Sequence, residues 1–466
     1  MSNKCSYSQT NLKENLNNCL KIIFNIKTNI QKKHNYQISC ALKIYKLPII
    51  LCYNHNLEIA SIFISTNSNG FNYFIKFGTD KIVFMIQLPL SKLSNVGTTI
   101  FSQMTQLANE NEAINLSQGF PDFMPDPELL NHVDHFIKKG FNQYAPLGGM
   151  MALKEEIARK IENSHQAVYH PDTEITVTAG GTQAIFTAIA AFVKKDDEVI
   201  IFEPAYDCYE PTVELFGGIV KRFEMKAPDY EIDWKTVKDL VSEKTRMIIL
   251  NNPNNPSGKI LKEEDIQELI QLVKDTSILI LSDEVYENIV FDGKQHLSIC
   301  KYPELKDRSL LVASFGKLFH VTGWKVGYCA APKMLTDEFR KVHQFNVFCV
   351  NTPIQLALAE YMKDDSHYIH LNQFFQEKRD FLRNGLSGTS FELLDCEGTY
   401  FQAVQYNKIS DKDDFDFATE LTIHHKVASV PFSSFYKNKL NEHVIRLCFA
   451  KKQETLERAI ENLSKV

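Results

Sequence analysis

The stretch Ser309-Leu-Leu-Val-Ala-Ser-Phe-Gly-Lys317 joins an apolar run, typical of a buried strand, to a lysine just beyond its end. The run Thr322-Gly-Trp-Lys-Val-Gly-Tyr328 follows within one or two helical turns. A lysine after a strand is most often a solvated surface cation, so this residue alone indicates no chemistry. Its meaning depends on which polar residues the fold places beside it.

Two further apolar runs also end in polar side chains. Met247-Ile-Ile-Leu leads into Asn-Asn-Pro-Asn-Asn255, and Ile278-Leu-Ile-Leu leads into Ser-Asp283-Glu-Val-Tyr286. Open α/β sheets bind their ligands in the crevice outside the carboxyl ends of the strands. We therefore expect Asn255, Asp283 and Tyr286 to lie at one site with Lys317.

Apolar runs alternate with helical stretches through the middle of the chain. The predicted strands are residues 174–178, 198–203, 246–251, 278–282 and 309–314. This alternation is typical of an α/β fold with a largely parallel, doubly wound sheet. After the first strand, Thr178-Ala-Gly-Gly-Thr-Gln183 opens a predicted helix whose apolar residues fall on one face, namely Ile185, Ala188, Ile189 and Phe192.

Several strings of the sequence resemble the motifs of one enzyme family, in the family's order. Besides the runs around Asn255, Asp283 and Lys317, they lie at residues 117–123 (Ser-Gln-Gly-Phe-Pro-Asp-Phe), 142–144 (Asn-Gln-Tyr), 203–209 (Glu-Pro-Ala-Tyr-Asp-Cys-Tyr), 396–401 (Cys-Glu-Gly-Thr-Tyr-Phe) and 445–450 (Ile-Arg-Leu-Cys-Phe-Ala). Over about residues 91–466 the chain resembles the fold-type I aminotransferases of class I and II, which depend on pyridoxal 5'-phosphate (PLP). Within them it looks most like the methionine aminotransferase branch, near the kynurenine and glutamine–phenylpyruvate transaminases.

The resemblance implies a role for each polar residue of the predicted site. Lys317 would hold PLP as a Schiff base and, once displaced, would carry a proton from the substrate α-carbon. Asp283 would stabilise the protonated pyridine nitrogen, which makes the ring an electron acceptor. Tyr286 and Asn255 would donate hydrogen bonds to the cofactor's phenolate oxygen. Tyr206 would stack on the ring.

The resemblance also implies a phosphate site at the start of the predicted helix. A turn of small residues at a helix N-terminus binds anions, and the residues implied here are Gly181, Thr182 and Gln183 through their amides, Ser314, Lys325, and Tyr144 from a partner subunit. The family's usual arginine is replaced by Lys325, which lacks the bidentate fork, so we expect looser cofactor binding. The family's usual Ser-x-Ser-Lys reads Ser314-Phe-Gly-Lys317 here.

For the substrate, the resemblance implies that Arg446 binds the α-carboxylate shared by amino acids and 2-oxo acids, since a guanidinium can bind it with two hydrogen bonds. Gly119 and Asn255 would hold the same carboxylate. Phe120 and Phe348 would line an apolar side-chain pocket, although both could be core residues. No motif supplies a second cation, so methionine, aromatic and other neutral donors are expected over aspartate.

Length and composition set the expected organisation. The 466 residues, 44% of them hydrophobic, suffice for several domains. We expect an N-terminal extension over residues 1–90, an arm that joins the small domain over 91–132, a large PLP-binding domain over 133–345, and a small α+β domain over 346–466. The resemblance implies a homodimer.

Other features exclude some classes of protein. No apolar run reaches the length of a membrane span, so no membrane partner is expected. The ten cysteines form no C-x-x-C pair, which indicates reduced thiols in a cytoplasmic protein rather than a zinc site or a disulfide scaffold. The pair His424-His425 is interpreted as a helix end, and no metal is expected.

The N-terminal segment differs from the rest of the chain. Residues 1–90 hold ten lysines, three acidic residues and no arginine, and they show no clear hydrophobic period. A mitochondrial presequence would be rich in arginine, so this asymmetry is interpreted as compositional drift. The family pattern begins near residue 91, which makes Met85 a candidate start of the catalytic chain.

Two other functions stay open at this point. A C–S lyase on the same fold would convert thioether amino acids to pyruvate and a thiol. A PLP-sensing transcription regulator would carry a DNA-binding domain ahead of the catalytic pattern, but residues 1–90 contain no arginine for phosphate or guanine contacts. No nucleic-acid partner is therefore expected.

Overall fold

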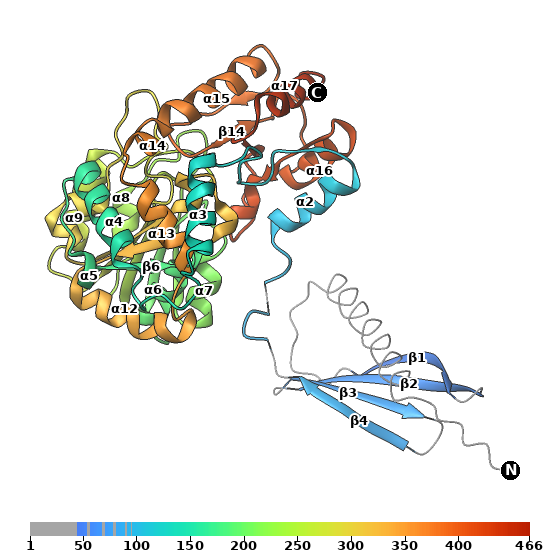
Figure 1. Cartoon of the computed structure of the whole chain (residues 1–466). Coiled ribbons are helices and arrows are strands. Elements are labelled where there is room, and N and C mark those ends of the chain that lie inside the picture. The colour runs from blue at the N-terminus through green and yellow to red at the C-terminus, as the bar shows by residue number, and fades with distance from the viewer. Residues whose placement is uncertain (1–43, 54–55, 68–69, 78–80, 89–90, 95) are drawn as a thin grey trace. The chain divides into compact units, whose positions relative to one another are not determined.

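The computed structural model describes residues 44–466, apart from 54–55, 68–69, 78–80, 89–90 and 95. It divides into two units, Met1–Ser94 and Asn95–Val466. Within the first unit four strands form an antiparallel meander in the order β1-β2-β3-β4 (Figure 1). Their bounds are β1 Ile44–Tyr53, β2 Asn56–Asn67, β3 Gly70–Phe77 and β4 Lys81–Leu88. The sequence analysis predicted no strand here.

A seven-stranded sheet forms the centre of the second unit, in the order β6-β12-β11-β10-β9-β7-β8. The bounds are β6 Ile175–Thr178, β7 Glu198–Glu203, β8 Ile219–Glu224, β9 Thr245–Asn251, β10 Leu279–Asp283, β11 Ser309–Ser314 and β12 Gly327–Ala330. Only β12 runs antiparallel to its neighbours. The predicted α/β fold with a largely parallel sheet is therefore confirmed.

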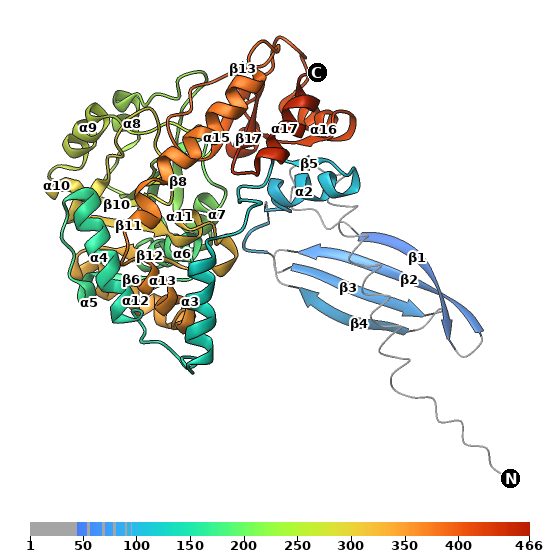
Figure 2. The same ribbon diagram turned by 45° about the horizontal axis from the view of Figure 1, so that its top comes forward.

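Helices cover both faces of this sheet (Figures 1 and 2). In β9, Met247 and Ile249 pack with α6, whereas Ile248 and Leu250 pack against α8 and α9. A strand buried on both faces is continuously apolar, which explains the unbroken hydrophobic runs. The helices are α3 Pro127–Lys138, α4 Met151–His165, α5 Pro171–Glu174, α6 Gly181–Phe192, α7 Tyr209–Leu215, α8 Trp234–Leu240, α9 Glu263–Val273, η1 Ile299–Lys301, α10 Pro303–Lys306, α11 Phe315–Leu318, η2 Thr322–Trp324, α12 Lys333–Asn346, α13 Thr352–Tyr361 and α14 Ser366–Ile369.

The C-terminal part contains a smaller antiparallel sheet, in the order β13-β14-β17-β16, with α15, α16 and α17 nearby (Figure 2). A parallel pair, β5 with β15, brings the segment after α2 beside this region. The bounds are α2 Ile100–Glu110, β5 Ile114–Asn115, α15 Leu371–Leu386, β13 Glu392–Leu393, β14 Phe401–Gln405, α16 Asp414–His424, β15 Val427–Ala428, β16 Val430–Pro431, η3 Phe432–Phe435, β17 Val444–Cys448 and α17 Gln453–Leu463.

Two expectations about individual segments can be checked directly. Helix α16 ends at His424, which confirms that the histidine pair is a helix end. Among the described residues, no group of histidine, cysteine, aspartate and glutamate side chains is arranged to hold a metal ion. None of the described helices combines the length and apolar character that a membrane span needs.

Candidate active site

A cavity of about 250 Å³ lies where the parallel strands of the large sheet end. The strands β6, β7, β9, β10 and β11 each deliver lining residues from the segment that follows or from their last residue. Of the residues singled out in the sequence, those that line it are Gly119, Gly181, Thr182, Tyr206, Asn255, Asp283, Tyr286, Ser314, Lys317, Lys325 and Arg446. Asn255, Asp283, Tyr286 and Lys317 thus lie at one site, as expected.

Lys317 lies in α11, a single helical turn after β11. Its Nζ donates to the Tyr400 hydroxyl at 2.6 Å and to the Gly119 carbonyl at 3.0 Å. Burial lowers the pKa of this amine to about 8, because the charged form loses solvation. An amine with that pKa is partly uncharged near neutral pH, so it can act as a nucleophile and as a base.

Asp283 ends β10 and is 3% exposed. Burial raises the pKa of its carboxyl to about 6, while the hydrogen bond from the Tyr209 hydroxyl, 2.6 Å from Oδ2, opposes that shift. Tyr209 is the first residue of α7, one helical turn after Tyr206. This position brings its hydroxyl to Asp283. A buried carboxylate of this kind gains stability from a cationic partner, such as a protonated ring nitrogen.

The two residues expected to meet the cofactor's phenolate oxygen are both held firmly. Oδ1 of Asn255 accepts from Nη1 of Arg446 at 2.6 Å, which leaves the amide group of Asn255 free to act as a donor. The backbone amide of Asn255 donates to Oδ1 of Asn251 at 2.7 Å. Tyr286 is 3% exposed, and burial raises the pKa of its phenol, so the hydroxyl remains a donor.

The expected phosphate end of the site begins at Gly180, whose φ of +80° is left-handed and suits glycine. Helix α6 starts at the next residue, and the backbone of Gly181 and Thr182 borders the cavity. A Cβ on Gly180 would lie 3.4 Å from Nζ of Lys325. The helix N-terminus and a lysine amine thus meet at one end of the cavity, which is a suitable site for an anion.

Gln183 does not line the cavity. Its side chain turns back, accepting from the backbone amide of Ala179 at 2.8 Å and donating to Thr187 Oγ1 at 2.6 Å. Any contribution to anion binding is therefore limited to its backbone amide, which stays a prediction.

Arg446 is fully enclosed on β17, with 1% of its surface exposed. Its guanidinium carbon lies 3.8 Å from the centroid of the Phe401 ring, and Nη2 donates to the Ser117 carbonyl at 3.0 Å. Burial lowers its pKa to about 10, so it is still a cation at neutral pH. Its Nε has no hydrogen-bond partner among the described residues, which leaves a donor for a ligand carboxylate.

Besides Gln183, three predicted residues do not line this cavity of their own chain. Tyr144 is 84% exposed and Phe348 is 46% exposed, and their rings lie edge to face, 5.5 Å apart. Phe120 is 45% exposed, and the Nζ of Lys451 lies 5.1 Å from its ring centroid. Their roles stay predictions, which for Tyr144 involve a partner subunit.

Four residues that shape the site had no role predicted from the sequence. Tyr209 and Tyr400 contact Asp283 and Lys317 directly, and Phe101 and Phe401 line the cavity. Tyr209, Tyr400 and Phe401 occur inside the motifs at residues 203–209 and 396–401. Their position in these motifs could have indicated that they belong to the site. Phe101 lies on α2, at the end of the segment with which the family pattern begins, and that position alone indicated no role.

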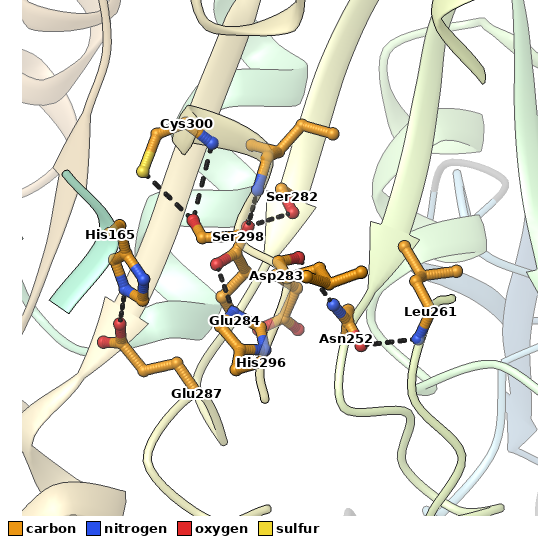
Figure 3. Close-up of polar contacts among 12 residues, drawn as sticks. His165, Asn252, Leu261, Ser282, Asp283, Glu284, Glu287, His296, Ser298 and Cys300 are labelled. Carbon is orange, nitrogen blue, oxygen red and sulfur yellow. Dashed lines mark hydrogen bonds and ion pairs between the residues drawn. The ribbon is translucent and has the colours of Figure 1, made fainter. Parts of the chain in front are cut away.

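A buried carboxylate holds the segment after Asp283 in place (Figure 3). Glu284 lies 2.7 Å from Nε2 of His296 and accepts from Ser282 Oγ at 2.7 Å and from the Ile299 amide at 3.0 Å. Burial raises the pKa of Glu284, but His296 and the Ile299 amide outweigh it and the net shift is downward. The carboxylate stays ionised and fixes the end of β10.

A second buried carboxylate, Glu287, lies in the same loop and is bound by two residues of α4. It accepts from Nζ of Lys160 at 2.7 Å and lies 2.6 Å from Nε2 of His165, and the Tyr328 hydroxyl donates to it at 3.3 Å. Burial raises the pKa of Glu287, yet Lys160 and His165 outweigh that effect and lower it well below its usual range. Tyr286 lies between these two anchored residues, so its hydroxyl has a defined position.

The donor set of the cavity fits PLP. An amine of lowered pKa, a buried carboxylate with no ion pair among the described residues, two hydrogen-bond donors (Asn255 and Tyr286) and a helix N-terminus beside a lysine line one cavity. A Cβ on Gly181 would lie 3.0 Å from a methyl group of Val285, so the first residue of α6 packs closely on the segment after Asp283. Lys317, Asp283, Asn255, Tyr286, Tyr206, Gly181, Thr182, Ser314 and Lys325 would hold the group.

Comparison with known proteins agrees with this geometry. Residues 111–463 match a model of the family described as aminotransferase class I and II. The chain is 48% identical to the methionine aminotransferase of Escherichia coli over 377 residues, which cover 81% of this chain and 98% of that protein. It is 31% identical to a kynurenine–oxoglutarate transaminase of Dictyostelium discoideum over 421 residues, 81% of this chain and 96% of that protein.

Solved structures agree as well. A crystal structure of Escherichia coli YbdL, reported with a methionine aminotransferase function, superposes with a TM-score of 0.81 at 47% identity and covers 82% of this chain and all of that one. The residues matched by the family model include Asp283, Lys317 and Arg446. The chain therefore belongs to the class I and II aminotransferases, which are PLP-dependent enzymes.

Proposed function

We propose that this aminotransferase takes its amino group from methionine, aromatic or related neutral amino acids and gives it to a 2-oxo acid. The observation that carries the proposal is the cation set of the cavity. Arg446 is the only arginine among the described residues that line it, and the other two cations, Lys317 and Lys325, are committed to the cofactor. A dicarboxylic donor needs a second cation for its distal acid, and the cavity of one chain offers none.

The name of the Escherichia coli relative supports methionine as a donor. The aromatic rings of Phe101 and Phe401 give the cavity apolar walls beside Arg446, which suits a thioether or an aromatic side chain. The expected contribution of Phe120 and Phe348 is part of this proposal.

The residues divide the work of the reaction between them. When bound, PLP supplies an aldehyde that bonds amines and a ring that accepts electrons. Arg446 binds the substrate carboxylate and fixes the α-carbon in place, with the amide of Asn255 and the backbone of Gly119 beside it. The released amine of Lys317 would take the α-proton onto Nζ and deliver it to C4', the carbon of PLP that carries the aldehyde. Asp283 holds the ring in its cationic form.

A homodimer is part of the proposal. Tyr144 and Phe348 form an exposed aromatic pair that lies outside the cavity of its own chain, as a pair that completes a partner's site would. The domain division at residues 133–345 and 346–466 and a cytoplasmic location are proposed too. The free thiols of Cys208, Cys300, Cys329, Cys349, Cys396 and Cys448 support that location.

The experiment is product analysis with single amino donors and one 2-oxo acceptor. Methionine and phenylalanine should yield their 2-oxo acids faster than aspartate yields oxaloacetate. A C–S lyase would instead release pyruvate or another shortened 2-oxo acid together with a thiol. Faster turnover of aspartate would show that a second cation reaches the site from a partner subunit.

A further inference from the structure

Lys317, the lysine that the mechanism requires, makes its shorter hydrogen bond to Tyr400. Its hydroxyl accepts from Nζ of Lys317 at 2.6 Å and donates to the carbonyl of Gly119 at 2.5 Å. The same lysine amine donates to that carbonyl at 3.0 Å. The three polar atoms therefore form a closed triangle with one charged donor and two uncharged acceptors.

The position of Tyr400 is fixed from several directions. The residue is fully buried just before β14, and its carbonyl accepts from the Phe449 amide at 3.0 Å. Its ring packs edge to face on Tyr286, with centroids 5.1 Å apart, and against Phe375 at 5.6 Å. A hydroxyl held this firmly presents its oxygen to Lys317 with little loss of side-chain entropy.

We propose that Tyr400 is a positioning residue for Lys317: its hydroxyl holds the amine whenever that amine is not bonded to the cofactor. This inference rests on the proposed function, because the reaction displaces the lysine from the cofactor by the substrate amine and then needs it again. When Nζ has taken the α-proton, the ammonium carries three N–H groups. Two are bound by Tyr400 and Gly119, and the third stays available for delivery to C4' of the cofactor. The phenol keeps its own proton throughout.

The surroundings of the triangle are consistent with this role. Burial raises the pKa of the Tyr400 phenol well above its ordinary value, so the hydroxyl remains neutral. The charged and titratable groups that act on Lys317 are Cys448, Arg446, Lys325, Asp283, Tyr286 and Tyr400. Arg446 and Lys325 are cations, and both disfavour the charged form of Lys317. The Tyr400 hydroxyl, a neutral acceptor 2.6 Å from Nζ, therefore has a clear effect on the pKa of Lys317.

Tyr400→Phe tests the proposal, with Tyr406→Phe as the matched control. Tyr406 is also fully buried, but its hydroxyl donates to the Lys412 carbonyl at 2.9 Å, away from the cavity. The first readout uses the full-length, cofactor-free protein: the rate of Lys317 carbamoylation by cyanate is followed against pH by mass spectrometry. The midpoint should fall by about one pH unit in Tyr400→Phe and stay unchanged in the control, because a hydrogen bond to a charged group is lost.

The second readout is steady-state kinetics of the PLP-loaded enzyme. Here kcat should fall about tenfold in Tyr400→Phe while the KM for the amino donor stays the same. An unmoved midpoint would overturn the inference, as would a wild-type kcat or an effect confined to KM. If Tyr400→Phe does not fold, 3-fluorotyrosine at this position, a weaker acceptor of nearly the same shape, should lower the midpoint in the same direction, and no movement would again overturn it.

The two proposals fail separately. The carbamoylation midpoint reports the Lys317–Tyr400 contact with no substrate present, whereas product analysis of the wild-type enzyme reports the reaction itself. A moved midpoint together with products of the wrong kind would reject the proposed function and leave the contact between Lys317 and Tyr400 standing, whereas an unmoved midpoint with the expected products would reject only the role of Tyr400.

Discussion

The Tyr209 hydroxyl donates a 2.6 Å hydrogen bond to Oδ2 of Asp283, and both side chains are buried. This bond opposes the effect of burial on the carboxyl, whose pKa is about 6. The ionised form, which a cationic cofactor ring requires, therefore depends in part on Tyr209.

Tyr209→Phe should raise the pKa of Asp283 further, because the bond it removes favours the carboxylate. The Kd for PLP should rise, and more at pH 6.5 than at pH 8.5, where the carboxyl is ionised in either case. Fluorescence or absorbance titration of cofactor-free protein at the two pH values gives the answer. Equal loss of affinity at both would indicate that Tyr209 acts only by packing.

Asp283→Asn should stabilise the cofactor-free protein at alkaline pH while it slows catalysis. The pKa of this carboxyl is raised from 3.8 to about 6 on folding, so the folded state binds the proton more tightly. Stability therefore falls as pH rises between these values and stays lower above them. Removing the charge should gain on the order of 3 kcal/mol at pH 8 and nothing near pH 3.5.

Thermal unfolding of the two cofactor-free proteins at both pH values measures this difference. With PLP bound, turnover by the asparagine variant should drop, since a neutral amide cannot hold the ring nitrogen in its cationic form. A variant that is less stable than wild type at pH 8 would contradict the account of Asp283.

Arg446→Lys should raise KM for the amino donor and for the 2-oxo acceptor together. Lysine keeps the charge but loses the planar fork that donates to Asn255 and Ser117 and leaves Nε for a ligand. Loss of one such charged hydrogen bond corresponds to about 10- to 100-fold in binding. Steady-state kinetics with each substrate varied in turn gives both constants. An effect on only one substrate would place Arg446 at the side chain instead.

The central sheet could be predicted because its strands are buried on both faces. The predicted bounds of β7 and β11 agree with the structure, those of β6 and β9 differ by one residue at one end, and β10 is shifted by one residue at both ends. Strand β8 was missed because Ile219–Glu224 is a partly exposed edge strand in which three of the six residues are charged, and β12 because Gly327–Ala330 is short and contains a glycine. In neither is the hydrophobic run long enough to stand out.

The site could be predicted as far as its motifs reach. Asp283 and Lys317 follow strands, so the position of each depends on local sequence. The contact between Tyr400 and Gly119 joins residues 281 apart in the chain, and it depends on how the C-terminal sheet packs on the rest of the second unit. Nothing in the local pattern of either segment carries that information.

Shortening the chain tests the role of the N-terminal unit. The sequence suggested a start at Met85, but that residue lies inside β4, whereas the second unit begins at Asn95. A chain of residues 95–466 should fold, bind PLP and transfer amino groups at the rate of the full chain, since each residue assigned to the site lies within it. A chain from Met85 would keep only part of β4 without its partner strand. Precipitation or loss of cofactor by the 95–466 chain would show that the first unit stabilises the second.

Transfer of ¹⁵N from labelled methionine to an unlabelled 2-oxo acid tests the central claim most directly. The full-length enzyme with PLP should place the label in the new amino acid and leave the 2-oxo acid of methionine. Lys317→Ala should still fold but transfer at least about 10²-fold more slowly, because both the bond to the cofactor and the movement of the α-proton depend on Nζ. Labelled ammonia with pyruvate or another shortened 2-oxo acid, or undiminished transfer by Lys317→Ala, would contradict the account.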